Sequence, residues 1–208
     1  MYQQTILFFT NSELGQASLC LAVAHEFLLR PSYNVHIASF APLHDAISQL
    51  NSRAVNFLSY SSSFTSARQA TFHTIPGLSM RQTLEQNHHF DPSNAFNLHG
   101  VGFHAASEAY RTVLSRAVAP WSGEEYMEIY RGCVAVLRKL DPVMVVLDPL
   151  FPQAIDACRS LKVKYVVLSP NTFKEHVAQP RLGNLWRYPM YVVHFLLGIM
   201  LADWIMLI

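Results

Sequence analysis

The sequence predicts an α/β protein built on a doubly wound parallel sheet. Short apolar runs alternate along the chain with longer segments of helical periodicity, which is the pattern of consecutive β-α-β units. The clearest strand candidate, 143–147, is a continuous apolar run between Pro142 and Pro149, as expected for a strand buried on both faces. With 208 residues, the chain has room for one such domain.

The first β-α-β unit is expected near the amino terminus. An apolar run over 6–9 is followed by a polar loop over 11–16 and by a helical stretch over 17–29. β-Branched and aromatic residues then predict a second strand over 35–40. The next expected elements are a short helix over 43–50 and a third strand over 54–58.

The remaining elements lie beyond a stretch, 59–102, whose fading periodicity predicts irregular surface structure. A helix is expected over 122–140, because Ser122 and Glu125 have the spacing of a capping box. The last expected elements are a helix over 153–161 and a strand over 165–168. At least five strands therefore alternate with helices.

Composition narrows the class of protein. Hydrophobic residues make up 51% of the sequence and charged residues 14%, against roughly 25% charged in an average soluble domain. We therefore expect a partner domain or a membrane to cover part of the surface. A net charge of +1 with scattered basic residues argues against nucleic-acid binding. No secretion signal is present, so we expect a cytoplasmic protein whose Cys20, Cys133 and Cys158 are buried reduced thiols.

The predicted topology points to one ligand site. In an open parallel sheet, ligands bind at the carboxyl ends of the strands, where the strand order reverses. With the order 3-2-1-4-5, the loop 11–16 and Asp148 face each other across that crevice. The loop also leads into a helix amino terminus, which favours strongly polar or anionic groups. The alternatives are a turn-closing role for Asp148 before Pro149 and a solvated amide for Gln16.

Two stretches of the sequence resemble a known family. They are Thr10–Ala17 with Leu21–Glu26, and Val145–Phe151. Together with the strand 35–40 and the segment 166–171, they look like the start of family 1 UDP-glycosyltransferases, particularly the fungal branch. The resemblance implies a GT-B architecture, in which a Rossmann-like acceptor domain faces a second domain that holds most of the UDP-sugar. It also implies inverting transfer without a metal or another cofactor.

The resemblance assigns roles residue by residue. In the family, a His base oriented by an Asp removes the proton of the acceptor hydroxyl, and imidazole has a suitable pKa for this step. Asp148 matches the orienting Asp, whereas Gln16 stands at the position of the His and Leu14 at its position in another form of the motif. Neither can accept a proton at neutral pH. The resemblance implies acceptor or donor contacts at Asn11, Ser12, Gly15, Ser169 and Asn171.

Other histidines are less suited to act as the base. His25 lies nine positions beyond Gln16, about 14 Å further along the predicted helix, and is expected to face solvent. His36 lies within a strand and is expected to be a core or cleft residue. A remote base from the irregular region is the alternative, with candidates at His73, His88, His89, His99 and His104. Their spacing suits no metal site.

The chain divides into an acceptor-binding domain over 1–180 and an apolar helical tail over 181–208, and no donor-binding domain is recognisable. The segment 190–208 is almost wholly apolar. It either packs under a partner domain or anchors the protein in a membrane, which takes about 20 such residues.

The predicted function is the acceptor-binding half of a UDP-sugar-dependent hexosyltransferase, with a small hydrophobic hydroxylated acceptor, inactive alone. One alternative is a noncatalytic Rossmann-like binding or interaction module, which the residues at positions 14 and 16 favour. Another is the acceptor subunit of a split transferase, with the donor domain on a partner chain. A generic nucleotide-binding module is disfavoured, because the first loop lacks a glycine-rich phosphate pattern.

Overall fold

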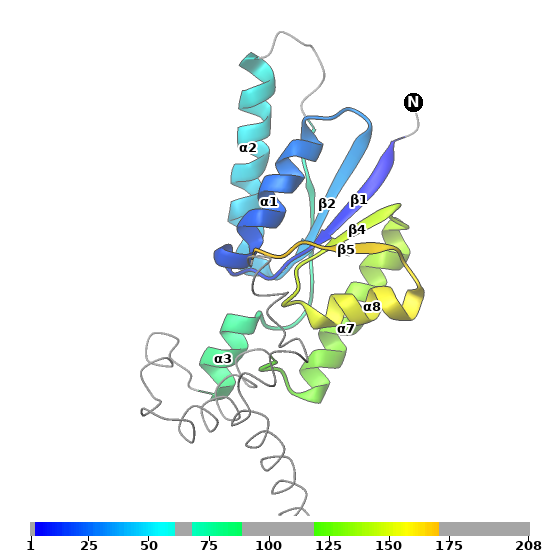
Figure 1. Ribbon diagram of the computed structural model, residues 1–208. Coiled ribbons are helices and arrows are strands. Elements are labelled where there is room, and N and C mark those ends of the chain that lie inside the picture. The colour runs from blue at the N-terminus through cyan, green and yellow to red at the C-terminus, as the bar shows by residue number, and fades with distance from the viewer. Residues whose placement is uncertain (1–2, 61–67, 89–118, 171–208) are drawn as a thin grey trace, which may run out of the picture. The chain divides into compact units, whose positions relative to one another are not determined.

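Five parallel strands form one sheet in the order β3-β2-β1-β4-β5 (Figure 1). The computed structural model describes residues 3–60, 68–88 and 119–170. The strands are β1 (Gln4–Phe9), β2 (Tyr33–Ser39), β3 (Thr71–Thr74), β4 (Met144–Leu147) and β5 (Tyr165–Val167). The order reverses beside β1, which pairs with β2 on one side and with β4 on the other. The predicted α/β class and parallel sheet are confirmed. The order 3-2-1-4-5, taken as the condition for the predicted site, is also the observed one, although β3 is not the segment predicted for the third strand.

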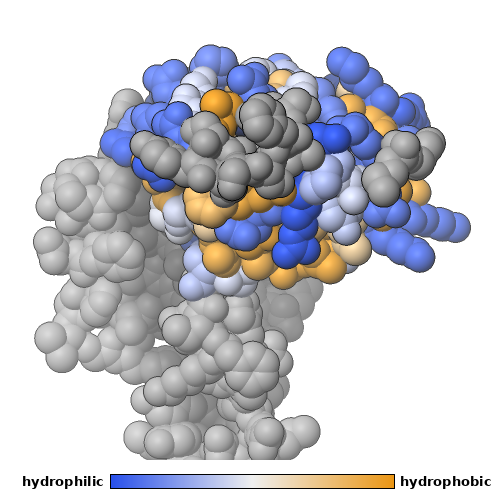
Figure 2. All heavy atoms as spheres, turned by 90° about the horizontal axis from the view of Figure 1, so that it is seen from above, coloured by the Kyte–Doolittle hydropathy of each residue, from blue (hydrophilic) through white to orange (hydrophobic). Residues whose placement is uncertain are grey.

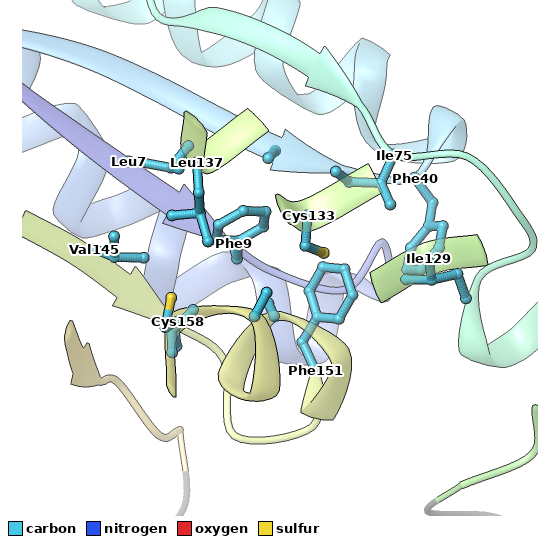
Figure 3. Close-up of a cluster of buried hydrophobic side chains, with 14 of the residues drawn as sticks. Leu7, Phe9, Phe40, Ile75, Ile129, Cys133, Leu137, Val145, Phe151 and Cys158 are labelled. Carbon is cyan, nitrogen blue, oxygen red and sulfur yellow. The ribbon is translucent and has the colours of Figure 1, made fainter. Parts of the chain in front are cut away.

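Helices cover both faces of the sheet, as a doubly wound fold requires. Helices α1 (Leu14–Leu28) and α2 (His44–Tyr60) pack on the face that carries Ile6 and Phe8. Helices α7 (Gly123–Leu140) and α8 (Pro152–Leu161) pack on the face that carries Leu7 and Phe9 (Figure 3). Alternate residues of β1 therefore enter two separate cores, and all four are between 0% and 3% exposed.

The third predicted strand, 54–58, is wrong. These residues belong to α2, which follows a short 3-10 turn (Ala41–Leu43) and continues to Tyr60. Ile47, Leu50 and Ala54 are buried at spacings of three and four residues and pack in the α1 and α2 core. That periodicity is helical, and it decides against a strand although the local composition is apolar.

The stretch 59–102 was predicted to be irregular, but part of it has regular structure. It contains β3 and helix α3 (Met80–His88), while 61–67 and 89–102 lie outside the described residues. β3 pairs with β2 over only four residues, and none of its side chains is fully buried. A short edge strand of this kind leaves little hydrophobic pattern in the sequence.

The carboxyl-terminal β-α-β unit follows the prediction closely. Ser122 caps α7 in a capping box with Glu125, as predicted, and Asp141 ends the helix in the left-handed conformation at φ 42°. α8 begins with Pro152 in its first turn, a position where the missing N–H costs nothing. β4 and β5 then pair along their length. This unit sets the end of β4 beside the end of β1.

The segment that leads from β3 into α3 is packed tightly against α7. A Cβ atom on Gly132 would lie 2.4 Å from Cδ of Pro76, so only glycine fits at that point of the helix. Gly77 has φ 93°, a conformation that side-chain-bearing residues rarely adopt. The Trp121 indole N–H donates to the Leu78 carbonyl at 2.9 Å. These contacts fix the position from which α3 starts.

Apolar side chains are exposed at β4 and β5. In the space-filling view, apolar surface interrupts a mainly hydrophilic exterior (Figure 2). Val143, Met144, Val166 and Val167 are between 37% and 50% exposed. The low content of charged residues therefore agrees with the apolar side chains that are exposed at β4 and β5.

The predicted division at residue 180 and the helical tail over 181–208 lie outside the described residues and stay predictions, as does a membrane anchor over 190–208. None of the helices in the described ranges combines the length and the hydropathy that a membrane span requires.

Candidate functional site

Asp148 follows β4 directly, at the carboxyl edge of the sheet and beside the end of β1. It is 1% exposed, and its N–H donates to the Phe9 carbonyl at 2.9 Å. Its Oδ2 accepts from the Asn11 N–H at 3.1 Å and from Thr10 Oγ1 at 3.3 Å. Its Oδ1 accepts from the Leu150 N–H at 2.9 Å. The carboxylate therefore joins the loops after β1 and β4, and the structure brings Asp148 together with the predicted loop.

The environment of this carboxylate is largely desolvated. Burial raises the pKa of Asp148, and the negative charge of Glu13 raises it further, while the three hydrogen bonds oppose the shift. Burial and the Asp148 charge also raise the pKa of Cys20 to about 11, so this thiol is protonated at neutral pH and is a poor nucleophile.

All three cysteines are buried free thiols, as predicted.

Gln16 lies in the first turn of α1, but among the described residues it makes no hydrogen bond to Asp148. Its N–H donates to the Glu13 carbonyl at 2.9 Å, and its Oε1 is buried without a partner. Leu14, the other position matched to the family base, is 63% exposed. The start of α1 therefore holds no proton acceptor at either of the matched positions.

The remaining residues predicted in the first loop differ in their surroundings. Asn11 is fully buried; its side-chain N–H group donates to the Leu150 carbonyl, whereas its Oδ1 has no partner. Ser12 Oγ lies 3.5 Å from Glu13 Oε1. Gly15 is exposed, and a Cβ atom added to it would meet nothing within 4 Å. A small residue at position 15 is therefore not required by packing.

Ser169 is half-buried and follows β5, the neighbour of β4, at the same carboxyl edge of the sheet. Asn171 lies outside the described residues, so its predicted contact is not located.

Buried polar atoms without a hydrogen-bond partner gather at this edge. They are Asn11 Oδ1, Glu13 Oε2, Gln16 Oε1, Ser39 Oγ and both polar atoms of the Gln153 side chain. Each of these residues lies at the end of a strand or in the loop or first helical turn that follows it. A buried unpaired polar atom is costly, so such atoms mark places where a hydrogen-bonding ligand or water is expected.

Sequence reasoning did not single out Glu13, Ser39 or Gln153. Polar residues are common where strands end, and nothing in the local pattern separates these three from solvated ones. Their signal is burial without a partner, and it arises only when the loops after β1, β2 and β4 are placed side by side.

The histidines do not replace the missing base among the described residues. His36 Nδ1 lies 2.9 Å from His73 Nε2, across β2 and β3, and burial lowers the pKa of both rings, with Lys139 contributing. His25 was predicted to face solvent. Its side chain is only 23% exposed, and its ring packs edge-on against Phe57. His88 ends α3, and His89, His99 and His104 lie outside the described residues. In the described ranges, no three His, Cys, Asp or Glu side chains are grouped to hold a metal ion.

Comparison with known proteins decides the class of the molecule. No protein-family model matches the chain. A glycosyltransferase of Sordaria araneosa, sdnJ, is 30% identical to it over 199 residues, which is 92% of this chain and 37% of that protein. The chain is a glycosyltransferase homologue. It matches the amino-terminal part of such proteins and spans little more than a third of the curated relative.

One solved structure supports the fold, and a second aligns less closely. The calicheamicin glycosyltransferase CalG4 aligns with a TM-score of 0.52 at 17% identity, covering 98% of this chain and 43% of that protein. This likeness shows a GT-B fold. SsfS6, a glycosyltransferase of Streptomyces sp. SF2575, aligns with a TM-score of 0.48 at 12% identity, covering 80% of this chain and 39% of that protein. The resemblance to glycosyltransferases noted in the sequence is confirmed by the sdnJ match.

Proposed function

We propose that this homologue is the acceptor-binding part of a nucleotide-sugar glycosyltransferase. It would place a small hydrophobic acceptor so that one hydroxyl attacks a hexosyl group of a UDP-sugar, and it would not complete the transfer alone. The cluster of buried unpaired polar atoms at the end of β1, including Asn11 Oδ1 and Gln16 Oε1, carries the proposal. A hydroxylated ligand can donate to such atoms, and the sdnJ match supports the class of reaction.

The charges at the site favour an acceptor over the nucleotide. Glu13 and Asp148 place two carboxylates near the start of α1, where a diphosphate would otherwise find free helix amides. Like charges repel, so a UDP-sugar diphosphate is disfavoured at this position. Leu14 adds an apolar side chain that is 63% exposed at the same helix start. Apolar contact beside polar anchors suits a hydrophobic molecule that carries a hydroxyl.

A noncatalytic binding module is the second candidate, and one observation favours it. Both carboxylate oxygens of Asp148 already accept hydrogen bonds from the protein, and none comes from position 16. The pair that would orient and activate a base in the family is therefore not assembled. A variant of the first candidate is a split transferase, in which a partner chain supplies the donor domain and this chain supplies acceptor binding.

Ligand binding by the chain separates these candidates. Isothermal titration with 4-methylumbelliferone, an apolar compound with one hydroxyl, should give saturable binding, whereas titration with UDP-glucose should give none. Binding of UDP-glucose without binding of the coumarin would contradict the proposed acceptor role. Binding of neither compound would favour the interaction module.

A further inference from the structure

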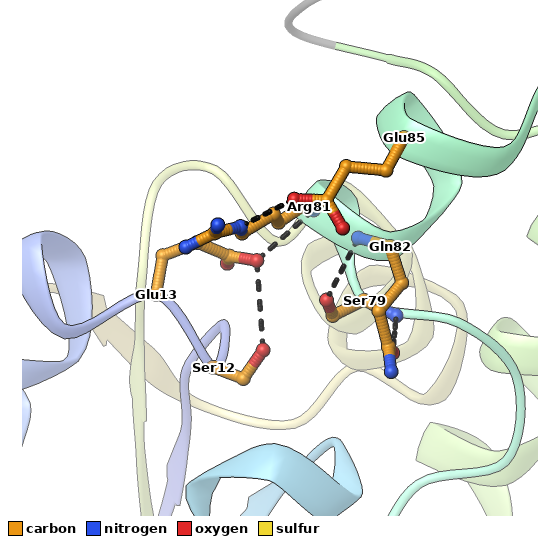
Figure 4. A network of polar contacts seen from close by, with 6 residues as sticks. All are labelled: Ser12, Glu13, Ser79, Arg81, Gln82 and Glu85. Carbon is orange, nitrogen blue, oxygen red and sulfur yellow. Dashed lines mark hydrogen bonds and ion pairs between the residues drawn. The ribbon is translucent and has the colours of Figure 1, made fainter. Parts of the chain in front are cut away.

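Glu13 lies where the amino termini of two helices converge (Figure 4). It is the N-cap residue of α1, yet its side chain makes no capping hydrogen bond to that helix. Its Oε1 instead accepts from the backbone N–H of Arg81, in the first turn of α3, at 3.0 Å. The carboxylate thus holds α3 against the start of α1, and its orientation is fixed by a contact that does not use Oε2.

The second oxygen of this carboxylate has no partner. Glu13 Oε2 is buried and accepts no hydrogen bond. A desolvated carboxylate oxygen without a donor is unfavourable by more than an unpaired neutral oxygen. Asn11, fully buried two positions earlier, has an unpaired Oδ1 as well. The start of α1 is therefore short of hydrogen-bond donors, which a ligand hydroxyl supplies.

Glu13 is also near the two positions implicated by the family resemblance. Its charge contributes to the raised pKa of Asp148, and Gln16 follows it by three residues at the helix start, where such pairs are neighbours. Gln16 is an amide and Asp148 has both oxygens engaged by the protein. Of the three, only Glu13 combines a negative charge with an unengaged oxygen.

We propose that Glu13 binds the acceptor hydroxyl through Oε2 and accepts its proton, in place of the missing imidazole. This inference rests on the proposed function. During transfer, the acceptor O–H bond breaks and its proton passes to Oε2. The acceptor oxygen forms a bond to the anomeric carbon of the nucleotide sugar, and the bond from that carbon to the nucleoside diphosphate breaks, with its electron pair leaving on the diphosphate.

The test compares two coumarins on the full chain. 4-Methylumbelliferone carries the hydroxyl, and 7-methoxy-4-methylcoumarin is its matched analogue without a donor. The wild-type chain should bind the hydroxyl compound about tenfold more tightly, since a hydrogen bond to a charged acceptor is among the stronger ones. Glu13→Gln should remove most of that preference and leave affinity for the methoxy compound unchanged. Glu85→Gln, which alters the carboxylate that pairs with the Arg81 side chain at 2.7 Å, should keep the preference.

A second readout separates direct contact between Glu13 and the ligand hydroxyl from a structural role. Absorbance titration of bound 4-methylumbelliferone should show a phenol pKa higher in the wild type than in Glu13→Gln, because a nearby carboxylate disfavours the phenolate. Equal phenol pKa values and an unchanged hydroxyl preference in Glu13→Gln would overturn the inference while leaving the proposed function intact. Failure of the wild type to bind either coumarin would overturn both. Thermal unfolding of Glu13→Gln should stay close to wild type, because the amide oxygen can still accept from the Arg81 N–H.

Discussion

The Asp148 carboxylate accepts a hydrogen bond from the backbone N–H of Asn11 at 3.1 Å, although the two residues are 137 positions apart. The bond holds the loop after β1 against the loop after β4 and so determines where α1 begins. Glu13, Gln16 and the exposed Leu14 are all placed by that helix start. The stability of the fold and the geometry of the candidate site therefore depend on the same carboxylate.

Replacing Asp148 with Ala should lower the free energy of unfolding by about 1–3 kcal/mol, because buried N–H groups of Asn11 and Leu150 lose their acceptor. Urea denaturation at neutral pH measures the change. Asp45→Ala is the control: this carboxylate is 96% exposed, and its loss should cost less than about 1 kcal/mol. Equal stability of the two variants would show that Asp148 is not a structural anchor.

Stability should depend on pH through the His36 and His73 pair. Their pKa values are lowered in the folded protein by burial, with Lys139 and, for His73, the neighbouring ring contributing. Below about pH 6.5 the unfolded chain therefore binds more protons than the folded one, and stability falls as the pH falls. His73→Gln should reduce this slope in unfolding measurements between pH 7.5 and 5.5. An unchanged slope in His73→Gln would contradict this account.

Replacing either of two glycines in α7 with alanine should change the free energy of unfolding by different amounts. Gly132→Ala would place a Cβ atom 2.4 Å from Pro76 Cδ, and we expect a loss of about 1–3 kcal/mol. A Cβ atom on Gly123 would meet nothing within 4 Å, so Gly123→Ala should be neutral or slightly stabilising. Thermal unfolding of the two variants measures the difference. Similar midpoints would mean that the segment around Pro76 yields easily and does not fix α3.

Features formed by contiguous residues could be predicted from the sequence, whereas features formed by residues far apart in the chain could not. The capping box of Ser122 and the apolar run of β4 lie in contiguous residues, and both were predicted. β3 was missed because a four-residue edge strand with two exposed and two half-buried residues has almost no pattern of its own. Glu13 was missed for another reason: its partner on α3 is 68 positions away, and its free oxygen is defined by burial.

Gln16→His should place an imidazole in the first turn of α1, at the position that the family resemblance assigns to the base. We expect it to strengthen binding of 4-methylumbelliferone severalfold, because a neutral imidazole accepts a hydrogen bond from a phenol better than a carboxamide does. The gain should disappear below about pH 6, where the ring is protonated and no longer accepts. Gln82→His, on α3, is the control and should not change the affinity. No gain at any pH would place side chain 16 outside the acceptor site.

Transfer activity tests the central claim most directly. The chain alone, and the chain joined to the part of Sordaria araneosa sdnJ that it does not match, are incubated with UDP-glucose and 4-methylumbelliferone, and released UDP is measured. The proposed acceptor role predicts no turnover by the chain alone and coumarin-dependent UDP release by the joined protein. Coumarin-dependent release of UDP by the chain alone would contradict it.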